Sequence, residues 1–282
     1  MKKTIFIILA IIFCMGGCST ANLVYRNADL YLQHKINSYA SFNPDQRASI
    51  EREVSNYMHW HRKNALPEYI IFLESLNKAI PSDVPLTEDK VADFRAELRH
   101  LYKMTITPTI RPTAKILTGL DSQQISELSV AFANKIQEQR DESLNGNLEE
   151  FLDKRSKKIL DFIEWLAGNL SREQSNKVKQ LNSQLPLVGE LFIAFREKNQ
   201  KTLLKLMNNH ADETQVSAHL TAWMINPESK RSSIQQQRIK NFEKESDYMI
   251  TQIHTLLTAQ QKIHLRNKFA SYIEDMQRLV AE

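Results

Sequence analysis

Apolar residues recur every three or four positions along most of this chain, and that spacing restricts it to helical structure. One stripe near the C-terminus consists of Leu265, Phe269, Tyr272, Met276 and Leu279. A second, less regular stripe consists of Ile234, Arg238, Phe242, Met249, Ile253 and Leu256. A third consists of Ile50, Val54, Tyr57, His61, Ala65, Tyr69, Phe72, Leu76 and Ile80. Because no segment shows clear period-two alternation, we predict an all-α fold, a multi-helix bundle of long helices.

Prolines and glycines predict where these helices bend or end. Pro67 interrupts the third stripe, so we expect a kink or break near Ala65. The segment from Thr105 to Thr113 is rich in Thr and Ile, but its two prolines argue against a strand, and we expect an irregular connection into a short helix. The chain has only six glycines, so few positions favour a departure from helical geometry. If the body divides into two bundles, we expect the boundary near Gly146.

The N-terminus carries the pattern of an export signal. Lys2 and Lys3 precede an apolar run from Thr4 to Met15, and Gly16, Gly17 and Cys18 follow it. A bilayer-spanning helix needs about 20 apolar residues, and this run is shorter. An ordinary secretory signal that is cleaved elsewhere, or an uncleaved anchor, would leave Cys18 as a thiol.

The Met-Gly-Gly-Cys sequence resembles the lipobox of bacterial lipoproteins, although Met15 stands where that pattern usually has Leu. The resemblance implies a cleaved signal peptide at 1–17, acyl chains on Cys18, a lipidated tether at 18–22 and a helical body at 23–282. With Ser19 in place of Asp after the cysteine, the resemblance also implies the outer membrane, with the body facing the periplasm. So short a tether would hold the body close to the membrane surface.

Composition argues against several classes of function. The two cysteines are Cys14 and Cys18, and the first lies in the predicted signal. Without Lys2 and Lys3, 35 basic and 33 acidic residues remain, a balance that argues against a nucleic-acid partner. The basic runs at 154–158 and at Lys230-Arg231 are short, and we interpret them as solvated helix faces, although anionic lipid headgroups are an alternative partner.

A short box recurs four times: an apolar residue, a capping residue, two variable positions and glutamine. The capping residue and the glutamine of the four copies are Asn43 and Gln46, Asp121 and Gln124, Ser171 and Gln174, and Thr258 and Gln261. Such a box caps a helix by itself, since the glutamine reaches back to the capping residue's amide. It also resembles the Leu-Thr-x-x-Gln motif of small periplasmic helical stress proteins, among them an ATP-independent chaperone, and only the copy from Leu257 to Gln261 matches that motif fully.

A second patch combines aromatic and basic side chains around the expected kink. We consider seven residues as candidates for partner binding: Trp60, His61, Arg62, Lys63, Tyr69, Arg155 and Trp165. The alternative is that Trp60 and Tyr69 belong to the core and that Arg62 and Lys63 are solvated. With the lipobox and the box at Gln46, these segments resemble a family of uncharacterised proteobacterial lipoproteins whose function is unknown.

Residue patterns give little support to an enzyme. His59 and His61 are two residues apart, which places them about 200° apart on a helix and unsuited to one metal ion. The sequence lacks a phosphate-binding loop and a nucleophile elbow. We therefore expect no cofactor, metal or small-molecule ligand. Our leading hypothesis is a lipid-anchored envelope protein with a binding or structural role and protein partners or clients. The alternatives are a holdase for periplasmic or outer-membrane clients and a hydrolase acting on envelope polymer.

Overall fold

The structure is a computed structural model that describes residues 24–80, 85–144 and 147–282. Within these ranges every regular element is helical and no strand occurs, which confirms the predicted all-α, multi-helix fold. The predicted signal peptide, Cys18, the tether and Gly146 lie outside the described residues.

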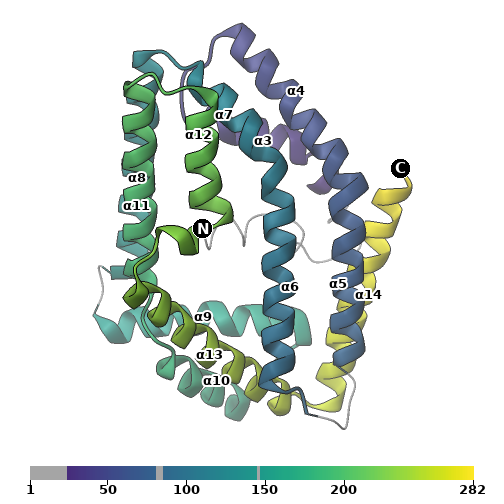
Figure 1. Cartoon of the computed structure of the whole chain (residues 1–282). Helices are drawn as coiled ribbons and strands as arrows, with labels where there is room; N and C mark the ends of the chain where they lie inside the picture. The colour runs from purple at the N-terminus through teal and green to yellow at the C-terminus, as the bar shows by residue number, and fades with distance from the viewer. Residues whose placement is uncertain (1–23, 81–84, 145–146) are drawn as a thin grey trace.

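The first half of the body contains α3 (Ala28–Asn37), α4 (Pro44–Trp60), α5 (Leu66–Ala79), α6 (Glu88–Ile106), α7 (Ile110–Thr118) and α8 (Ser122–Leu144). The second half contains α9 (Leu148–Ala167), α10 (Arg172–Gln184), α11 (Gly189–Asn208), α12 (Glu213–Leu220), α13 (Ser233–Leu256) and α14 (Ala259–Ala281). In Figure 1, α9, α10 and α13 lie across the lower end of the molecule, whereas α5, α6, α8, α11 and α14 run along its length.

Four clusters of buried apolar side chains hold these helices together. The first joins α5, α6 and α14 with Tyr25, and the second joins α6, α7 and α8 with α11 and α12. A third lies between α9, α10 and α13, and a fourth between α3 and α4. The first two clusters combine helices from both sides of residue 146, so both halves contribute to the same interior. The two-bundle division near 146 stays a prediction.

The kink expected near Ala65 takes the form of a π-helical turn, His61–Ala65, which links α4 to α5. Pro67 has no amide hydrogen and its ring crowds the preceding turn. The wider turn accommodates this, and its closing bond runs from the Leu66 N–H to the His61 carbonyl, five residues back. The side-chain amide of Asn64 donates to the Trp60 carbonyl oxygen at 2.9 Å. The helix therefore bends without breaking.

The segment from Thr105 to Thr113 is helical, so the prediction of an irregular connection was wrong. Helix α6 continues to Ile106, and a single 3₁₀ turn, Thr107–Thr109, leads into α7. Pro108 and Pro112 each stand in the first turn of a helical element, where an amide hydrogen is not needed. None of the described helices is long and apolar enough to span a bilayer.

Candidate functional site

Each of the four glutamine boxes stands at the start of a helix and caps it. Asn43 caps α4, Ser171 caps α10 and Thr258 caps α14 with reciprocal capping-box bonds. Asp121 precedes α8 and makes the same two bonds with Gln124, at 3.1 and 2.8 Å. In every box the glutamine oxygen accepts the amide hydrogen of the capping residue. The boxes therefore satisfy amides that a helix start leaves unpaired.

The boxes also bind one another in pairs, which sequence reasoning did not predict. The Gln46 side-chain nitrogen donates to the Gln124 oxygen at 3.0 Å, and the Gln124 nitrogen donates to the Gln46 oxygen at 2.7 Å. Gln46 also donates to the Gly119 carbonyl, and Gln124 to the Ser41 carbonyl, both at 2.9 Å. We call this arrangement a glutamine clasp; it joins the starts of α4 and α8.

A second clasp joins the starts of α10 and α14 with the same pattern. Gln174 and Gln261 exchange side-chain hydrogen bonds at 2.8 and 3.2 Å. Gln174 also donates to the Leu256 carbonyl and Gln261 to the Asn169 carbonyl. In all four boxes the carbonyl that receives the partner's amide belongs to the residue two positions before the cap. The two clasps therefore match bond for bond, and they lie at opposite ends of the molecule in Figure 1.

Each clasp uses the full hydrogen-bonding capacity of its two side-chain amides. A glutamine amide has two donor hydrogens and an oxygen that accepts two bonds. In the first clasp, both hydrogens of Gln46 and both of Gln124 are donated, and each oxygen accepts twice. Gln124 and Gln174 are buried. The boxes thus have a role beyond capping, since they connect helix ends 78 and 87 positions apart.

Two further capping boxes escaped sequence analysis, at Asp212 and Gln215 and at Ser232 and Gln235. Neither glutamine is part of a clasp among the described residues. Their sequences differ from the paired boxes at the position before the cap, which is Ala211 in one and Arg231 in the other. The paired boxes have Phe or Leu there. A large apolar side chain before the cap is therefore the sequence feature that the four paired boxes share and the two unpaired ones lack.

The aromatic and basic patch surrounds the π-helical turn, but most of it is packed into the protein. His61 and Tyr69 are buried, Trp60 and Arg62 are half-buried, and Lys63 is exposed. The Trp60 ring stacks on Tyr57 with 6.0 Å between ring centroids. The Tyr69 hydroxyl bonds the hydroxyl of Thr105 on α6.

His61 lies among three tyrosine rings within this patch. Its Nδ1 is 3.0 Å from the Tyr25 hydroxyl, and its ring contacts those of Tyr25, Tyr57 and Tyr69. Burial lowers the pKa of His61 to about 4, and burial also raises the pKa of Tyr25 to about 12. Both groups are therefore neutral near pH 7, and they fix the first described residues to the π-helical turn.

Arg155 and Trp165 do not join this patch. The Arg155 guanidinium donates to the Asn182 carbonyl at the end of α10 and lies over the Phe151 ring. Trp165 packs on Tyr272 of α14, and the Lys268 ammonium lies 5.0 Å from its ring centroid. The seven predicted partner-binding residues thus occupy three places: the π-helical turn, the α9–α10 contact and the α9–α14 contact.

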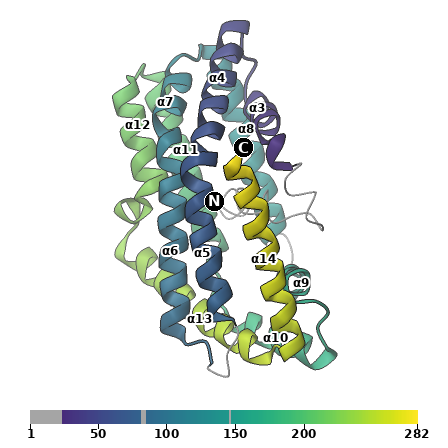
Figure 2. The same cartoon turned by 90° about the vertical axis from the view of Figure 1, so that its right-hand side faces the viewer.

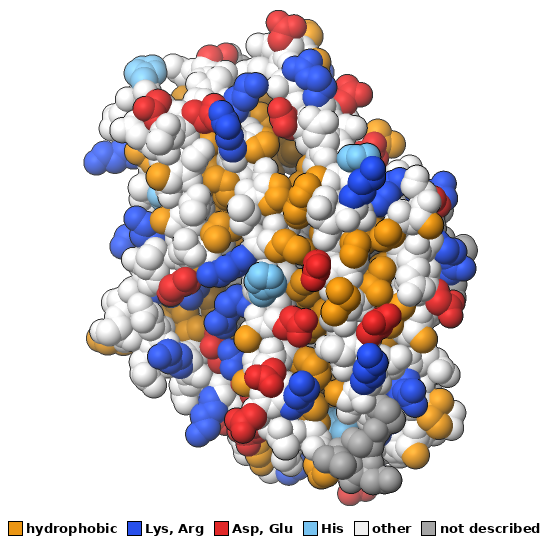
Figure 3. Space-filling view, turned by 45° about the vertical axis from the view of Figure 1, so that its right-hand side comes forward, with side chains coloured by type: hydrophobic (Ala, Val, Ile, Leu, Met, Phe, Trp, Pro, Cys, Tyr) orange, Lys and Arg blue, Asp and Glu red, His pale blue; other side chains and the backbone are white. Residues whose placement is uncertain are grey.

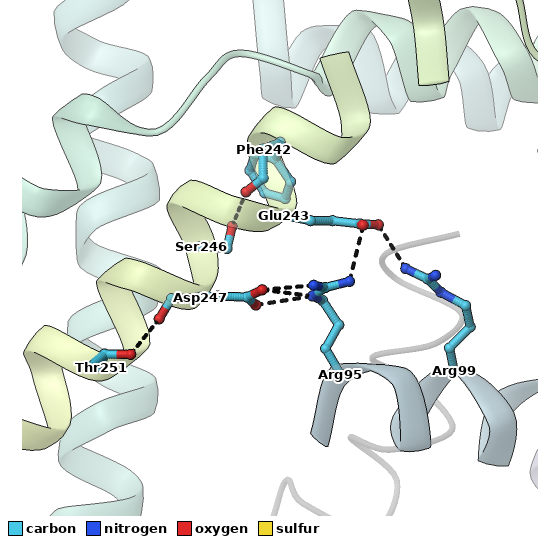
Figure 4. Close-up of polar contacts among 7 residues, drawn as sticks. All are labelled: Arg95, Arg99, Phe242, Glu243, Ser246, Asp247 and Thr251. Carbon is cyan, nitrogen blue, oxygen red and sulfur yellow. Dashed lines mark hydrogen bonds and ion pairs between the residues drawn. The ribbon is translucent and has the colours of Figure 1, made fainter. Parts of the chain in front are cut away.

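An ion-pair network between α6 and α13 was also missed (Figure 4). Arg95 donates two bonds to the Asp247 carboxylate, at 3.0 and 2.7 Å, and a third to Glu243. Arg99 binds the other Glu243 oxygen at 2.8 Å. The Asp247 side chain is only 6 % exposed, and its bond is the main cause that raises the pKa of Arg95. This network ties the central helix α6 to the second half of the chain.

The pockets lined by the described residues are shallow. One, between α8 and α9, is lined by the charged side chains of Asp141, Glu142, Lys154, Lys157, Lys158 and Asp161. Another, of about 700 Å³, lies between the α3–α4 linker and α8. Its two charged residues are engaged, because Glu127 accepts the Ser41 amide and Arg47 donates to the Phe42 carbonyl. In the part of the chain that the structure describes, no group of three or more His, Cys, Asp or Glu side chains is placed to hold a metal ion.

Comparison with known proteins yields one match. The pattern of a family described as "Family of unknown function (DUF6279)" covers residues 38–233. This range includes three of the four glutamine boxes. No curated protein and no solved structure matches the chain.

Proposed function

The chain belongs to the DUF6279 family, and we propose that it is a lipid-anchored, non-enzymatic binding or structural protein of the bacterial envelope. Acyl chains on Cys18 would hold it at the membrane, and the helical body would face the periplasm. The proposal rests on the pair of glutamine clasps together with the export signal and lipobox-like sequence.

The clasps support a structural role because they use polar side chains to fix helix ends. A catalytic site needs polar groups that converge on open space, within hydrogen-bond reach of a substrate. Here the buried amides of Gln124 and Gln174 are bonded to other helix starts, and His61 is bonded to Tyr25. Such an interior favours one fixed shape, which suits a protein that presents a surface to partners.

The face formed by α5 and α6 is the surface that best fits a protein partner. Figure 3 shows hydrophobic side chains at the centre of this face, with charged side chains among and around them. Helix α5 carries Ile71, which is 54 % exposed, and α6 carries the half-buried Leu98 and Met104. An apolar area within a polar rim is typical of a protein interaction site.

In-cell crosslinking tests this assignment directly. A photoreactive amino acid at Ile71 should capture defined envelope proteins, which mass spectrometry would identify. The matched control is Ile234, which is 73 % exposed and lies in the first turn of α13, outside the α5–α6 face. Equal capture at both positions, or capture of no protein at Ile71, would contradict a partner surface on α5 and α6.

Replacement of Cys18 with Ser tests the anchor. The variant should lose its acyl mass and leave the membrane fraction, since stable attachment requires two or more hydrophobic signals and acyl chains supply them. Crosslinking at Ile71 should weaken with it if partners are membrane-bound.

Two assays separate the alternatives. A holdase would suppress aggregation of unfolded clients at near-stoichiometric amounts without nucleotide, and a hydrolase would release soluble fragments from envelope polymer. The clasp geometry disfavours the holdase. The motif that suggested it is the one from Leu257 to Gln261, and the Gln261 side chain is hydrogen-bonded to Gln174 and to the Asn169 carbonyl within the protein.

A further inference from the structure

We propose that the outward surface of α3, centred on Leu30 and Tyr31, is where the body contacts the lipid bilayer. The proposal rests on the acylation of Cys18 put forward above, and it adds an orientation to that anchor. Leu30 is 60 % exposed and Tyr31 is 45 % exposed. They are adjacent in the chain and lie on the first full helix after the predicted tether.

The residues just before α3 are fixed to the rest of the body. Tyr25 is 6 % exposed, and its hydroxyl bonds His61 in the π-helical turn. The Arg62 guanidinium lies over the Tyr25 ring, 5.8 Å from its centroid. Arg26 forms an ion pair with Glu282, the last residue of the chain. The start of α3 is therefore held by two distant segments, and its direction relative to the body is set.

The sequence places this fixed point close to the predicted lipid. Tyr25 lies seven positions after Cys18, and a fully extended chain over seven positions reaches about 25 Å. Acyl chains would hold Cys18 at the membrane surface, so the start of α3 would lie within about 25 Å of that surface. The surface around Tyr25 would therefore lie near the membrane.

One face of helix α3 packs against the rest of the protein, and the opposite face is exposed. Ala28 is buried, and Leu32 and Ile36 pack against the cluster shared with α4. The opposite stripe contains Leu30, Tyr31 and His34, all of them exposed. Figure 2 shows α3 at the outer edge of the molecule, on the side away from α12. Nothing in the described chain covers that stripe.

The chemistry of the stripe suits a lipid interface. Tyrosine combines an apolar ring with a hydroxyl and is enriched where membrane meets water. Leu30 offers an aliphatic side chain to the acyl region, and the Lys35 ammonium in the last turn of α3 can approach lipid phosphates. Two side chains bind weakly alone, but the acyl anchor supplies attachment, so the stripe needs only to set orientation.

Fluorescence quenching in vesicles tests the orientation. The acylated full-length chain with Leu30→Cys would be labelled with an environment-sensitive fluorophore, since Cys18 would be blocked by its acyl chains. The matched control is Ile234→Cys on α13. Each protein would be reconstituted in vesicles of phosphatidylethanolamine and phosphatidylglycerol, with a nitroxide near the carbonyl end of the acyl chains. We expect loss of fluorescence at position 30 and none at position 234.

The outcomes separate this proposal from the proposed anchor. Suppose that the proteins float with the vesicles but the label at position 30 is not quenched, or that both labels are quenched equally. The bilayer contact of α3 is then wrong, whereas the lipid anchor is supported. If the wild-type chain does not float, both proposals are wrong. A thiol-specific crosslink between two Leu30→Cys chains in detergent would assign the stripe to a second copy and overturn the bilayer contact.

Discussion

Gln46 and Gln124 are 78 positions apart, yet each side-chain amide donates to and accepts from the other, at 3.0 and 2.7 Å. Gln174 and Gln261 repeat the relationship at the other end of the molecule. The residue type is essential, because an amide can cap its own helix with its oxygen while its nitrogen bonds a neighbouring helix. Glutamate could do the first but not the second.

The Gln174→Glu substitution should remove bonds of the clasp while it keeps the bond that caps α10. The carboxylate still accepts the Ser171 amide, but it cannot donate to the Leu256 carbonyl and it faces the Gln261 oxygen. Loss of these bonds at a buried position should lower the free energy of unfolding by about 2–3 kcal/mol. Urea denaturation followed by circular dichroism would measure it.

The control for this variant is Gln235→Glu. Gln235 has the same Ser-x-x-Gln box but no clasp among the described residues, so its change should stay within about 0.5 kcal/mol. Equal losses in the two variants would show that the clasp adds nothing to capping.

A double-mutant cycle should show coupling within a clasp and none between clasps. Gln46→Ala and Gln124→Ala each remove both bonds between the two side-chain amides, so the second substitution should cost less than the first. We expect an interaction free energy of about 1–2 kcal/mol. The pair Gln46→Ala and Gln174→Ala belongs to different clasps and should be additive; coupling there would contradict two independent units.

Arg95→Ala should destabilise the fold far more than a surface arginine does. It leaves the Asp247 carboxylate, whose side chain is 6 % exposed, without its bidentate partner. Removing one partner of a buried pair costs about 3 kcal/mol or more. Arg111 pairs with Glu213 at 3.0 Å but is 88 % exposed, so Arg111→Ala should cost less than about 1 kcal/mol. Thermal unfolding of both variants would compare them, and similar losses would rule out a special role for the network.

Stability should fall as the pH drops from about 6.5 to about 4, partly through His61. Its pKa is about 4 in the folded protein and 6.5 ordinarily, so the unfolded chain binds the proton more readily between those values. The stabilising effect is complete above pH 6.5 and is lost on acidification, by at most about 3 kcal/mol. His61→Gln should flatten this dependence in urea titrations at several pH values, whereas His100→Gln, at an exposed site on α6, should not.

The sequence predicted helices and caps because both depend on local spacing. The third stripe also carries a sign of the π-helical turn. Its members Tyr57, His61, Ala65 and Tyr69 are spaced by four residues each, so three turns take twelve residues. Three turns of a regular α-helix take about eleven. Such a run indicates an inserted residue, whereas Pro67 alone predicts a kink or break.

Long-range contacts had no comparable local signal. Arg95 and Asp247 are 152 positions apart, and nothing near either one marks it as half of a buried pair. The pairing of the glutamine boxes also depends on which helix starts meet in the fold. Only the Phe or Leu before each cap hinted at it, since that side chain packs inward and brings the box against its neighbour.

Helix α5 packs against α14, and Arg26 forms an ion pair with Glu282, so the N-terminal and C-terminal parts of the chain contact each other. During synthesis the apolar stripe of α5 emerges about 190 residues before the helix that covers it. Contacts of such long range slow folding, because chain entropy is lost before the contacts form. A truncation within α14 should therefore leave the apolar stripe of α5 exposed.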